Sequence, residues 1–118
     1  MKVPRRGDIV RMSFDSQAGH EHMKRRPALV VSPEAFNTAF GLAYVMPITS
    51  KARGHAFEVP LPETCAVRGV VVTQQLKSLD WRARRAEVIC RAPAGVVANA
   101  VEILRDIIES NEDDLDKR

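Results

Sequence analysis

The hydrophobic pattern of this chain changes its period once, near Pro93, and that change limits the folds open to it. Before Pro93, short stretches alternate apolar and polar residues, as at Val10, Met12 and Phe14, which is the period of a half-buried strand. After Pro93, apolar residues recur three and four positions apart and form one helical face. That face consists of Val97, Ala100, Val101, Leu104, Ile107 and Ile108. The pattern predicts a mainly β domain with α, a small barrel of five to seven short strands with one C-terminal amphipathic helix.

Turn residues divide the part before Pro93 into short segments. We expect strands over residues 10–14, 28–31, 42–48, 57–61, 69–73 and 86–90. Residues 33–40 read as a turn or a short helix. Segment 69–73 is the richest in β-branched residues and is predicted to be the central strand, whereas Pro47 predicts an edge or a bulge in segment 42–48. Trp81 is expected in the core or at a dimer contact.

Length and charge narrow the class of protein. The 118 residues suit one domain, which we expect to span residues 1–110, with residues 111–118 as a disordered acidic tail. The formal charge is +3, but the last ten residues hold five acids and two bases, so the rest of the chain has 16 bases against 10 acids, or +6. Such a basic body suggests an anionic partner, nucleic acid or an acidic peptide, with a merely solvated basic surface as the alternative.

Several features bear on location. Residues 1–6 run directly into a strand pattern rather than into a signal peptide, and no apolar run approaches the ~18 residues of a membrane span. Cys65 and Cys90 lack a paired spacing and are expected to be buried small hydrophobes of a reducing compartment. We therefore expect a cytoplasmic protein with no membrane partner.

A polar loop before residue 28 carries groups suited to phosphodiester chemistry. His20, Glu21 and Arg26 lie within seven residues, and their side chains can move protons at a phosphodiester and hold its charge. Pro27 favours an extended Arg26 and so gives that side chain a defined direction. Two histidines at 20 and 22, without a third clear ligand, are weak evidence for a metal, so we expect neither metal nor cofactor.

A set of short motifs runs from about Arg6 to Ile108. The motifs include Arg6-Gly7-Asp8-Ile9-Val10, Arg26-Pro27-Ala28-Leu29-Val30, Pro47-Ile48-Thr49-Ser50, Gln75-Leu76-Lys77-Ser78 and Asp80-Trp81-Arg82-Ala83-Arg84. In this order and at this spacing they resemble the MazF/PemK toxins of bacterial toxin–antitoxin pairs. The resemblance implies an SH3-like barrel, usually a homodimer, that cuts single-stranded RNA at specific sequences without a metal and is silenced by an acidic antitoxin. The RNA 2′-OH would attack the phosphorus and leave a 2′,3′-cyclic phosphate.

The resemblance also implies site residues. Arg26 matches the catalytic arginine, and Thr49 matches a threonine whose hydroxyl can donate to phosphate or cap a turn. His20 matches the histidine of PemK-type members, and Glu21 matches a glutamate that serves as the base or orients the loop. We expect RNA to be held by Arg25, Ser50, Lys51, Arg53, Gln75, Lys77, Arg82 and Arg84.

The match departs from the PemK pattern at the acid and base positions. These positions are Val72 and Gln74 here, and neither side chain can serve as a base or an acid. Which catalytic residue is the acid and which the base therefore stays open. Two other functions also stay open: a toxin of the same fold that inhibits a protein target such as DNA gyrase without cleaving RNA, and a non-catalytic nucleic-acid-binding barrel. Glu21, Arg26 and Thr49 favour the ribonuclease, because a pure binder does not need all of them together.

Overall fold

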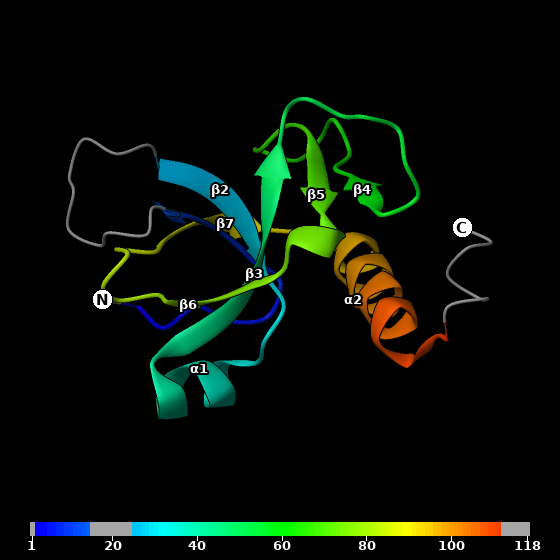
Figure 1. Ribbon diagram of the computed structural model, residues 1–118. Helices are drawn as coiled ribbons and strands as arrows, with labels where there is room; N and C mark the ends of the chain where they lie inside the picture. The colour runs from blue at the N-terminus through cyan, green and yellow to red at the C-terminus, as the bar shows by residue number, and fades with distance from the viewer. Residues whose placement is uncertain (1, 15–24, 112–118) are drawn as a thin grey trace.

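The computed structural model describes residues 2–14 and 25–111 (Figure 1). The strands are β1 (Asp8–Ser13), β2 (Arg25–Val30), β3 (Leu42–Thr49), β4 (Glu58–Pro60), β5 (Val70–Val72), β6 (Lys77–Asp80) and β7 (Glu87–Arg91). The helices are α1 (Glu34–Phe40), the short 3₁₀ helix η1 (Thr73–Gln75) and α2 (Ala94–Glu109). The predicted acidic tail, residues 111–118, lies almost entirely outside the described residues. No helix of the described ranges has the length and apolar character needed to cross a membrane.

All seven strands join one antiparallel sheet. The order is β4-β5-β3-β2-β1-β7, and β6 pairs with β3 alongside β5. No pairing joins the two outer strands, β4 and β7, within the described residues, so hydrogen bonds do not close the sheet. In Figure 1, α1 lies at the start of β3 and α2 lies beside η1 and the short β4–β5 pair. The predicted mainly β fold with five to seven strands and a C-terminal helix is confirmed.

One face of the sheet is covered by α2. Ile9, Leu29 and Met46 are fully buried on this face, because alternate strand residues point to the same side. They pack in one cluster with Ala100 and Ile103 of α2. The helix begins at Ala94, directly after Pro93. Most of the predicted face packs against the sheet, but Ile108 is 69% exposed, so its predicted place on that face is wrong; Val96 and Ile103 are buried instead. Burial of this face fixes α2 against the sheet.

The opposite face packs around Trp81. This side chain is 2% exposed and shares a cluster with Val10, Val30 and Val45. Its indole N–H donates to the main-chain oxygen of Asn37 over 2.9 Å. Trp81 is therefore a core residue, which is the first of the two places expected for it, the core or a dimer contact.

The central strand is β3, and the prediction that segment 69–73 would be central is wrong. Along one edge β3 pairs with β2; along the other it pairs first with β6, over residues 42–45, and then with β5, over residues 48–49. β5 has only three residues, all buried, so its β-branched composition reflects burial rather than a central position. Pro47 falls between the β6 and β5 pairings. On its other side Pro47 pairs with Ala28 of β2 without a register shift, so it marks a gap in pairing along one edge of β3 and not the predicted edge or bulge.

Candidate active site

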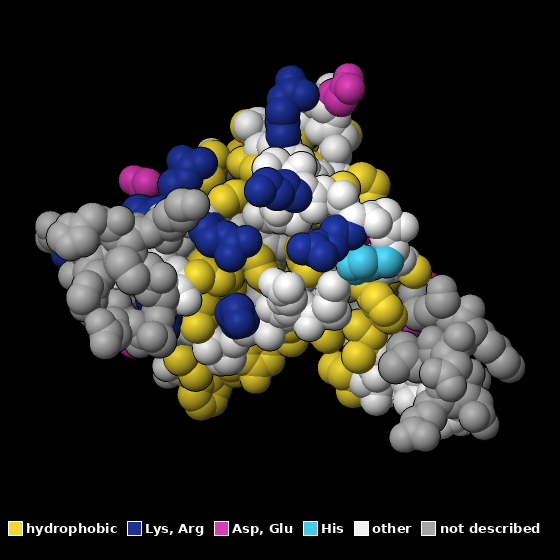
Figure 2. All heavy atoms as spheres, turned by 45° about the horizontal axis from the view of Figure 1, so that its top comes forward, with side chains coloured by type: hydrophobic (Ala, Val, Ile, Leu, Met, Phe, Trp, Pro, Cys, Tyr) yellow, Lys and Arg dark blue, Asp and Glu magenta, His cyan; other side chains and the backbone are white. Residues whose placement is uncertain are grey.

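A cleft of about 200 Å³ lies where β2 begins and β3 ends. It is lined by Arg26, Thr49, Lys51, Arg53, His55, Glu58, Val72, Gln74 and Gln75. These residues come from β2, β3, the loop after β3, β4, β5 and η1. Figure 2, which brings the top of Figure 1 forward, shows Lys and Arg side chains gathered on this face beside a histidine. The cleft thus unites five of the predicted site residues: Arg26, Thr49, Lys51, Arg53 and Gln75.

Arg26 projects from β2 as an exposed side chain. It lies opposite Met12 of β1, and its guanidinium carbon sits 5.7 Å from the centre of the Phe14 ring. A guanidinium over an aromatic face is held weakly, by about 0.5–1 kcal/mol at an exposed site. The ring therefore orients Arg26 and leaves its N–H fork able to bind a bidentate anion such as phosphate.

Thr49 ends β3, and its hydroxyl shapes the turn that follows. The Thr49 Oγ1 accepts the backbone N–H of Lys51 over 3.1 Å. The hydroxyl proton is not used in that bond and can be donated into the cleft. The turn-capping role expected for Thr49 is therefore observed, and donation of its hydroxyl to a phosphate stays a prediction.

Glu58 holds the loop after β3 in shape. Its carboxylate accepts the backbone N–H of Arg53, at 3.0 and 3.1 Å to the two oxygens, and that of Gly54 at 2.8 Å. The side chain is only 6% exposed. The N–H of Arg53 is the largest influence that lowers the pKa of Glu58 below its ordinary value, and burial acts in the opposite direction. Glu58 is thus an ionised anchor for the loop that carries Lys51 and Arg53.

His55 lies between Glu58 and Gln74. Its Nε2 is 3.6 Å from Glu58 Oε2, an ion-pair distance longer than a hydrogen bond, and 3.3 Å from Gln74 Nε2. The ring also lies beside Phe57 in a tilted arrangement, with centroids 6.1 Å apart. Sequence reasoning gave His55 and Glu58 no role, although a histidine at the end of a polar loop, followed three residues later by a glutamate, was a usable signal.

Comparison with known proteins identifies the family of this chain. Residues 5–108 match the family described as PemK-like, MazF-like toxin of type II toxin-antitoxin system. This chain belongs to that family. The resemblance drawn from the motifs is therefore confirmed.

Named relatives of this family toxin are endoribonucleases. This chain is 43% identical over 109 residues to the endoribonuclease toxin ChpB of Escherichia coli K12. The match covers 88% of this chain and 93% of ChpB. This chain is 39% identical over 84 residues to the endoribonuclease toxin MazF of the same strain, covering 71% and 75%. Its fold matches a chain in the crystal structure of MazE-MazF (Form-II) from Deinococcus radiodurans with a TM-score of 0.85, at 46% identity, covering 94% of this chain and 100% of that one.

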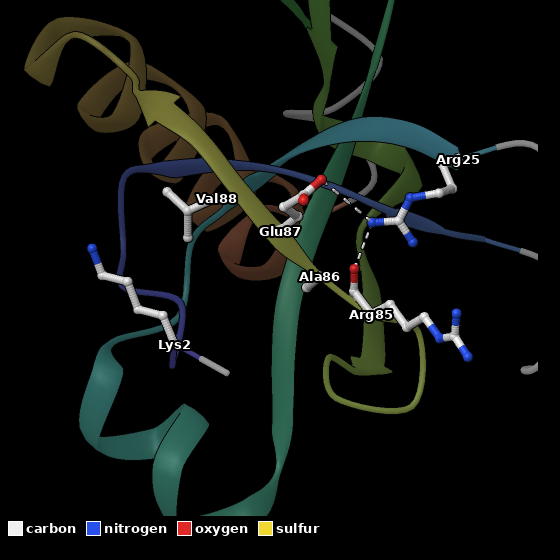
Figure 3. Close-up of a pocket in the computed structure, with 6 residues that line it drawn as sticks. All are labelled: Lys2, Arg25, Arg85, Ala86, Glu87 and Val88. Atoms are coloured by element: carbon white, nitrogen blue, oxygen red, sulfur yellow. Dashed lines mark hydrogen bonds and ion pairs between the residues drawn. The ribbon is translucent and has the colours of Figure 1, made fainter.

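Arg25 of this toxin lies apart from the cleft, because neighbouring strand residues face opposite ways. It lines a separate hollow of about 660 Å³ and points between Glu87 and the turn before β7 (Figure 3). Its Nη2 donates to the carbonyl oxygens of Arg11, at 3.0 Å, and Arg85, at 2.6 Å, and lies 4.0 Å from Glu87. Arg85 has a left-handed backbone with φ 54°. The structure therefore gives Arg25 a structural role, and its predicted RNA contact stays a prediction.

The other predicted RNA-binding residues, Ser50, Lys77, Arg82 and Arg84, do not line the cleft. Lys77 is exposed on β6, and Ser50 is exposed directly after Thr49. In the turn between β6 and β7, Arg82 lies 5.3 Å from the Trp81 ring, and Arg84 donates to the main-chain oxygen of Ser13 over 3.3 Å. His20 and Glu21 lie outside the described residues.

Both cysteines are half-buried, so the expectation of full burial is corrected. They pack against the cluster under α2 as free thiols. Burial, followed by the neighbouring Cys65, raises the pKa of the Cys90 thiol. A thiol that resists ionisation is a poor nucleophile, so Cys90 is a packing residue.

Proposed function

We propose that this toxin is a sequence-specific endoribonuclease that cleaves single-stranded RNA in the cleft between β2, β3 and η1. The observation that carries the proposal is that Arg26 and Thr49, from different strands, line one small cleft together with Lys51 and Arg53. The endoribonuclease names of its relatives support the same activity. They favour it over inhibition of a protein target or non-catalytic binding.

The chemistry is attack of the RNA 2′-OH on the adjacent phosphorus, giving a 2′,3′-cyclic phosphate and a free 5′-OH. Arg26 binds two phosphate oxygens and stabilises the charge that grows on them in the transition state. The Thr49 hydroxyl donates to the same phosphate, while Lys51 and Arg53 hold neighbouring phosphates. Proton transfer by the residues present needs no metal or cofactor. His20 and Glu21 remain proposed participants from the loop that ends at Arg26.

Regulation by an acidic antitoxin follows from the charge. The chain before its acidic end carries a formal +6, which attracts an extended acidic peptide as it attracts RNA. The structural relative described as MazE-MazF fits such a partner. We further propose a homodimer, in which a two-fold axis extends a shallow cleft into a longer groove. Light scattering at micromolar concentration tests the dimer, and a monomer there contradicts it.

One experiment tests the central proposal. The purified protein is incubated with a long single-stranded RNA in EDTA, and the new ends are examined. We expect discrete cuts that leave 2′,3′-cyclic phosphate and 5′-OH ends, and a 2′-deoxy substitution at a mapped cut should block that cut. No cleavage, or cleavage only after Mg²⁺ or Zn²⁺ is restored, contradicts the proposed mechanism.

A further inference from the structure

We propose that His55 is the general base of this cleft and accepts the proton of the attacking 2′-OH through its Nδ1 atom. This inference rests on the proposed ribonuclease function and identifies which described residue performs its first proton transfer. It assigns a role to a side chain that none of the sequence motifs singled out.

Few of the side chains described in the cleft can accept a proton. Among the described lining residues, the titratable side chains are Arg26, Lys51, Arg53, His55 and Glu58. Two guanidinium groups and an ammonium group enter the cleft as cations and act as donors. The Glu58 carboxylate is nearly buried, and both its oxygens already accept backbone N–H groups. His55, with 37% of its side chain exposed, is left as the described lining group whose neutral form has a free lone pair for a proton.

Glu58 favours one tautomer of the His55 imidazole. Its Oε2 lies 3.6 Å from His55 Nε2 and favours a proton on that nitrogen. A neutral imidazole carries one proton, so a proton on Nε2 leaves the Nδ1 lone pair as the acceptor. The recorded polar contacts of the ring within the described residues all fall on Nε2. A carboxylate in this place also stabilises the imidazolium that forms once Nδ1 takes a proton.

Gln74 is the second polar side chain beside the His55 ring. It stands at the position where PemK-type members carry an acidic residue, and a glutamine amide cannot take a proton. Its side-chain amide lies 3.3 Å from His55 Nε2. The amide nitrogen can only donate, so with the proton on Nε2 the amide is turned to present its oxygen, which accepts that proton and holds the ring. The charged groups around His55 have both signs: Arg26, Lys51 and Arg53 are cationic and Glu58 is anionic.

The step balances as follows. The 2′ oxygen forms a bond to phosphorus as its proton moves to Nδ1 of His55. The bond between phosphorus and the 5′ oxygen breaks, its electron pair stays on that oxygen, and the oxygen takes a proton from a second acid or from water. The imidazolium of His55 then returns its proton to water.

The test uses a DNA oligonucleotide that holds one ribonucleotide at a cut mapped on the long RNA. It is made with either an ordinary 5′ oxygen or a 5′ bridging sulfur as the leaving atom. For His55→Gln we expect a single-turnover rate roughly 10²–10⁴ lower and loss of the limb of the pH profile on which the rate rises with pH. Binding of the all-deoxy oligonucleotide should stay within about twofold, because this oligonucleotide lacks the 2′-OH on which His55 acts.

The sulfur substrate separates a base from an acid. A sulfur leaving group needs no protonation, so it restores the rate of a variant that lacks the general acid but not of one that lacks the base. We expect His55→Gln to be equally slow on both substrates. Restoration by sulfur overturns the inference, as does a His55→Gln rate within a few-fold of the wild type with an unchanged pH profile. If instead the wild-type protein cuts no RNA, it is the proposed function that fails.

Two further variants guard against a folding artefact. Arg105→Ala, on the exposed outer face of α2, is the matched control and should cleave as the wild type does. His55→Ala removes the whole ring, and imidazole added to the buffer should restore part of its rate. A folded His55→Ala protein that shows no response to imidazole overturns the inference.

Discussion

Gly69 packs directly against the main-chain carbonyl of Thr49. Its φ is +124°, a backbone conformation that side chains with a Cβ rarely adopt, and a Cβ added there would overlap the Thr49 carbonyl group. The contact lies where β5 begins to pair with the end of β3. A glycine outside the cleft thus allows the approach that sets the position of a cleft hydroxyl.

Gly69→Ala is therefore expected to reduce both stability and cleavage. Strain at this φ and displacement of Thr49 should lower the free energy of unfolding by roughly 2–4 kcal/mol. Gly41→Ala is the matched control: Gly41 has φ +67° but open space around it, so only about 1–2 kcal/mol of backbone strain is expected there. Urea unfolding and RNA cleavage measure the two effects. Equal losses for the two variants would contradict the role of the close contact.

Arg26 and Arg25 are neighbours with opposite expected phenotypes. Arg26→Ala should leave stability nearly unchanged, because its guanidinium is exposed, and should lower cleavage by about 10²–10³-fold through lost transition-state stabilisation. Arg25→Ala should lower the free energy of unfolding by about 1–3 kcal/mol, because carbonyl groups lose their donor. Cleavage per folded molecule should persist in Arg25→Ala. A folded Arg26→Ala protein that cuts RNA normally would remove Arg26 from the mechanism.

The lowered pKa of Glu58 predicts that the protein loses stability in acid. The Glu58 pKa is lowered in the folded protein, chiefly by the Arg53 N–H, so the unfolded chain takes up a proton near the ordinary value of 4.5 while the folded chain stays ionised to lower pH. The stabilisation is therefore complete above pH 4.5 and is lost as the pH falls through the lower, folded value. The stability difference between wild type and Glu58→Gln, measured by urea unfolding, should be largest at neutral pH and shrink in acid. A difference independent of pH would show that the charge of Glu58 is not responsible.

Lys51 and Arg53 should contribute to RNA binding through phosphate contacts. Each contact to single-stranded RNA releases counterions and adds about 0.7 to the slope of log affinity against log salt. Lys51→Ala and Arg53→Ala should each reduce the slope by about that amount, measured with a 2′-O-methyl RNA that cannot be cleaved. Arg105→Ala is the charge-matched control and should leave the slope unchanged. The same result for all three variants would place RNA elsewhere.

The periodic parts of the fold were accessible from sequence, because a buried face imposes its own spacing. The apolar spacing from Val97 to Ile108 predicted most of α2, and alternation predicted β1 and β4. The four residues of β6 (Lys77–Asp80) were not among the expected strands, because Lys77, Ser78 and Asp80 are exposed and leave no buried face to detect. The gap in pairing at Pro47 depends on which strands pair with β3, and the residues around Pro47 do not indicate those partners.

The site was predictable where a side chain belongs to a motif. Arg26 and Thr49 were found in this way, and the structure brings them to one cleft. The structural contacts of Arg25 were not predictable, because charge alone does not show which way a strand residue points or whether backbone carbonyls bind it. His55 was missed because its neighbours Glu58 and Gln74 give it its setting, and the pairing of β4 with β5 brings Gln74 to it.

β3 joins the two halves of the cleft. Folding of a newly made chain and assembly of its cleft are therefore one event. Arg26 reaches the cleft through β2 on one edge of β3, and Gln75 reaches it through β5 and η1 on the other. Both pairings close long loops, which costs chain entropy before the contacts form. A nascent chain that has emerged only as far as β3 holds Arg26 and Thr49 but lacks the η1 side of the cleft. The toxin therefore cannot assemble its cleft before most of its sequence has left the ribosome.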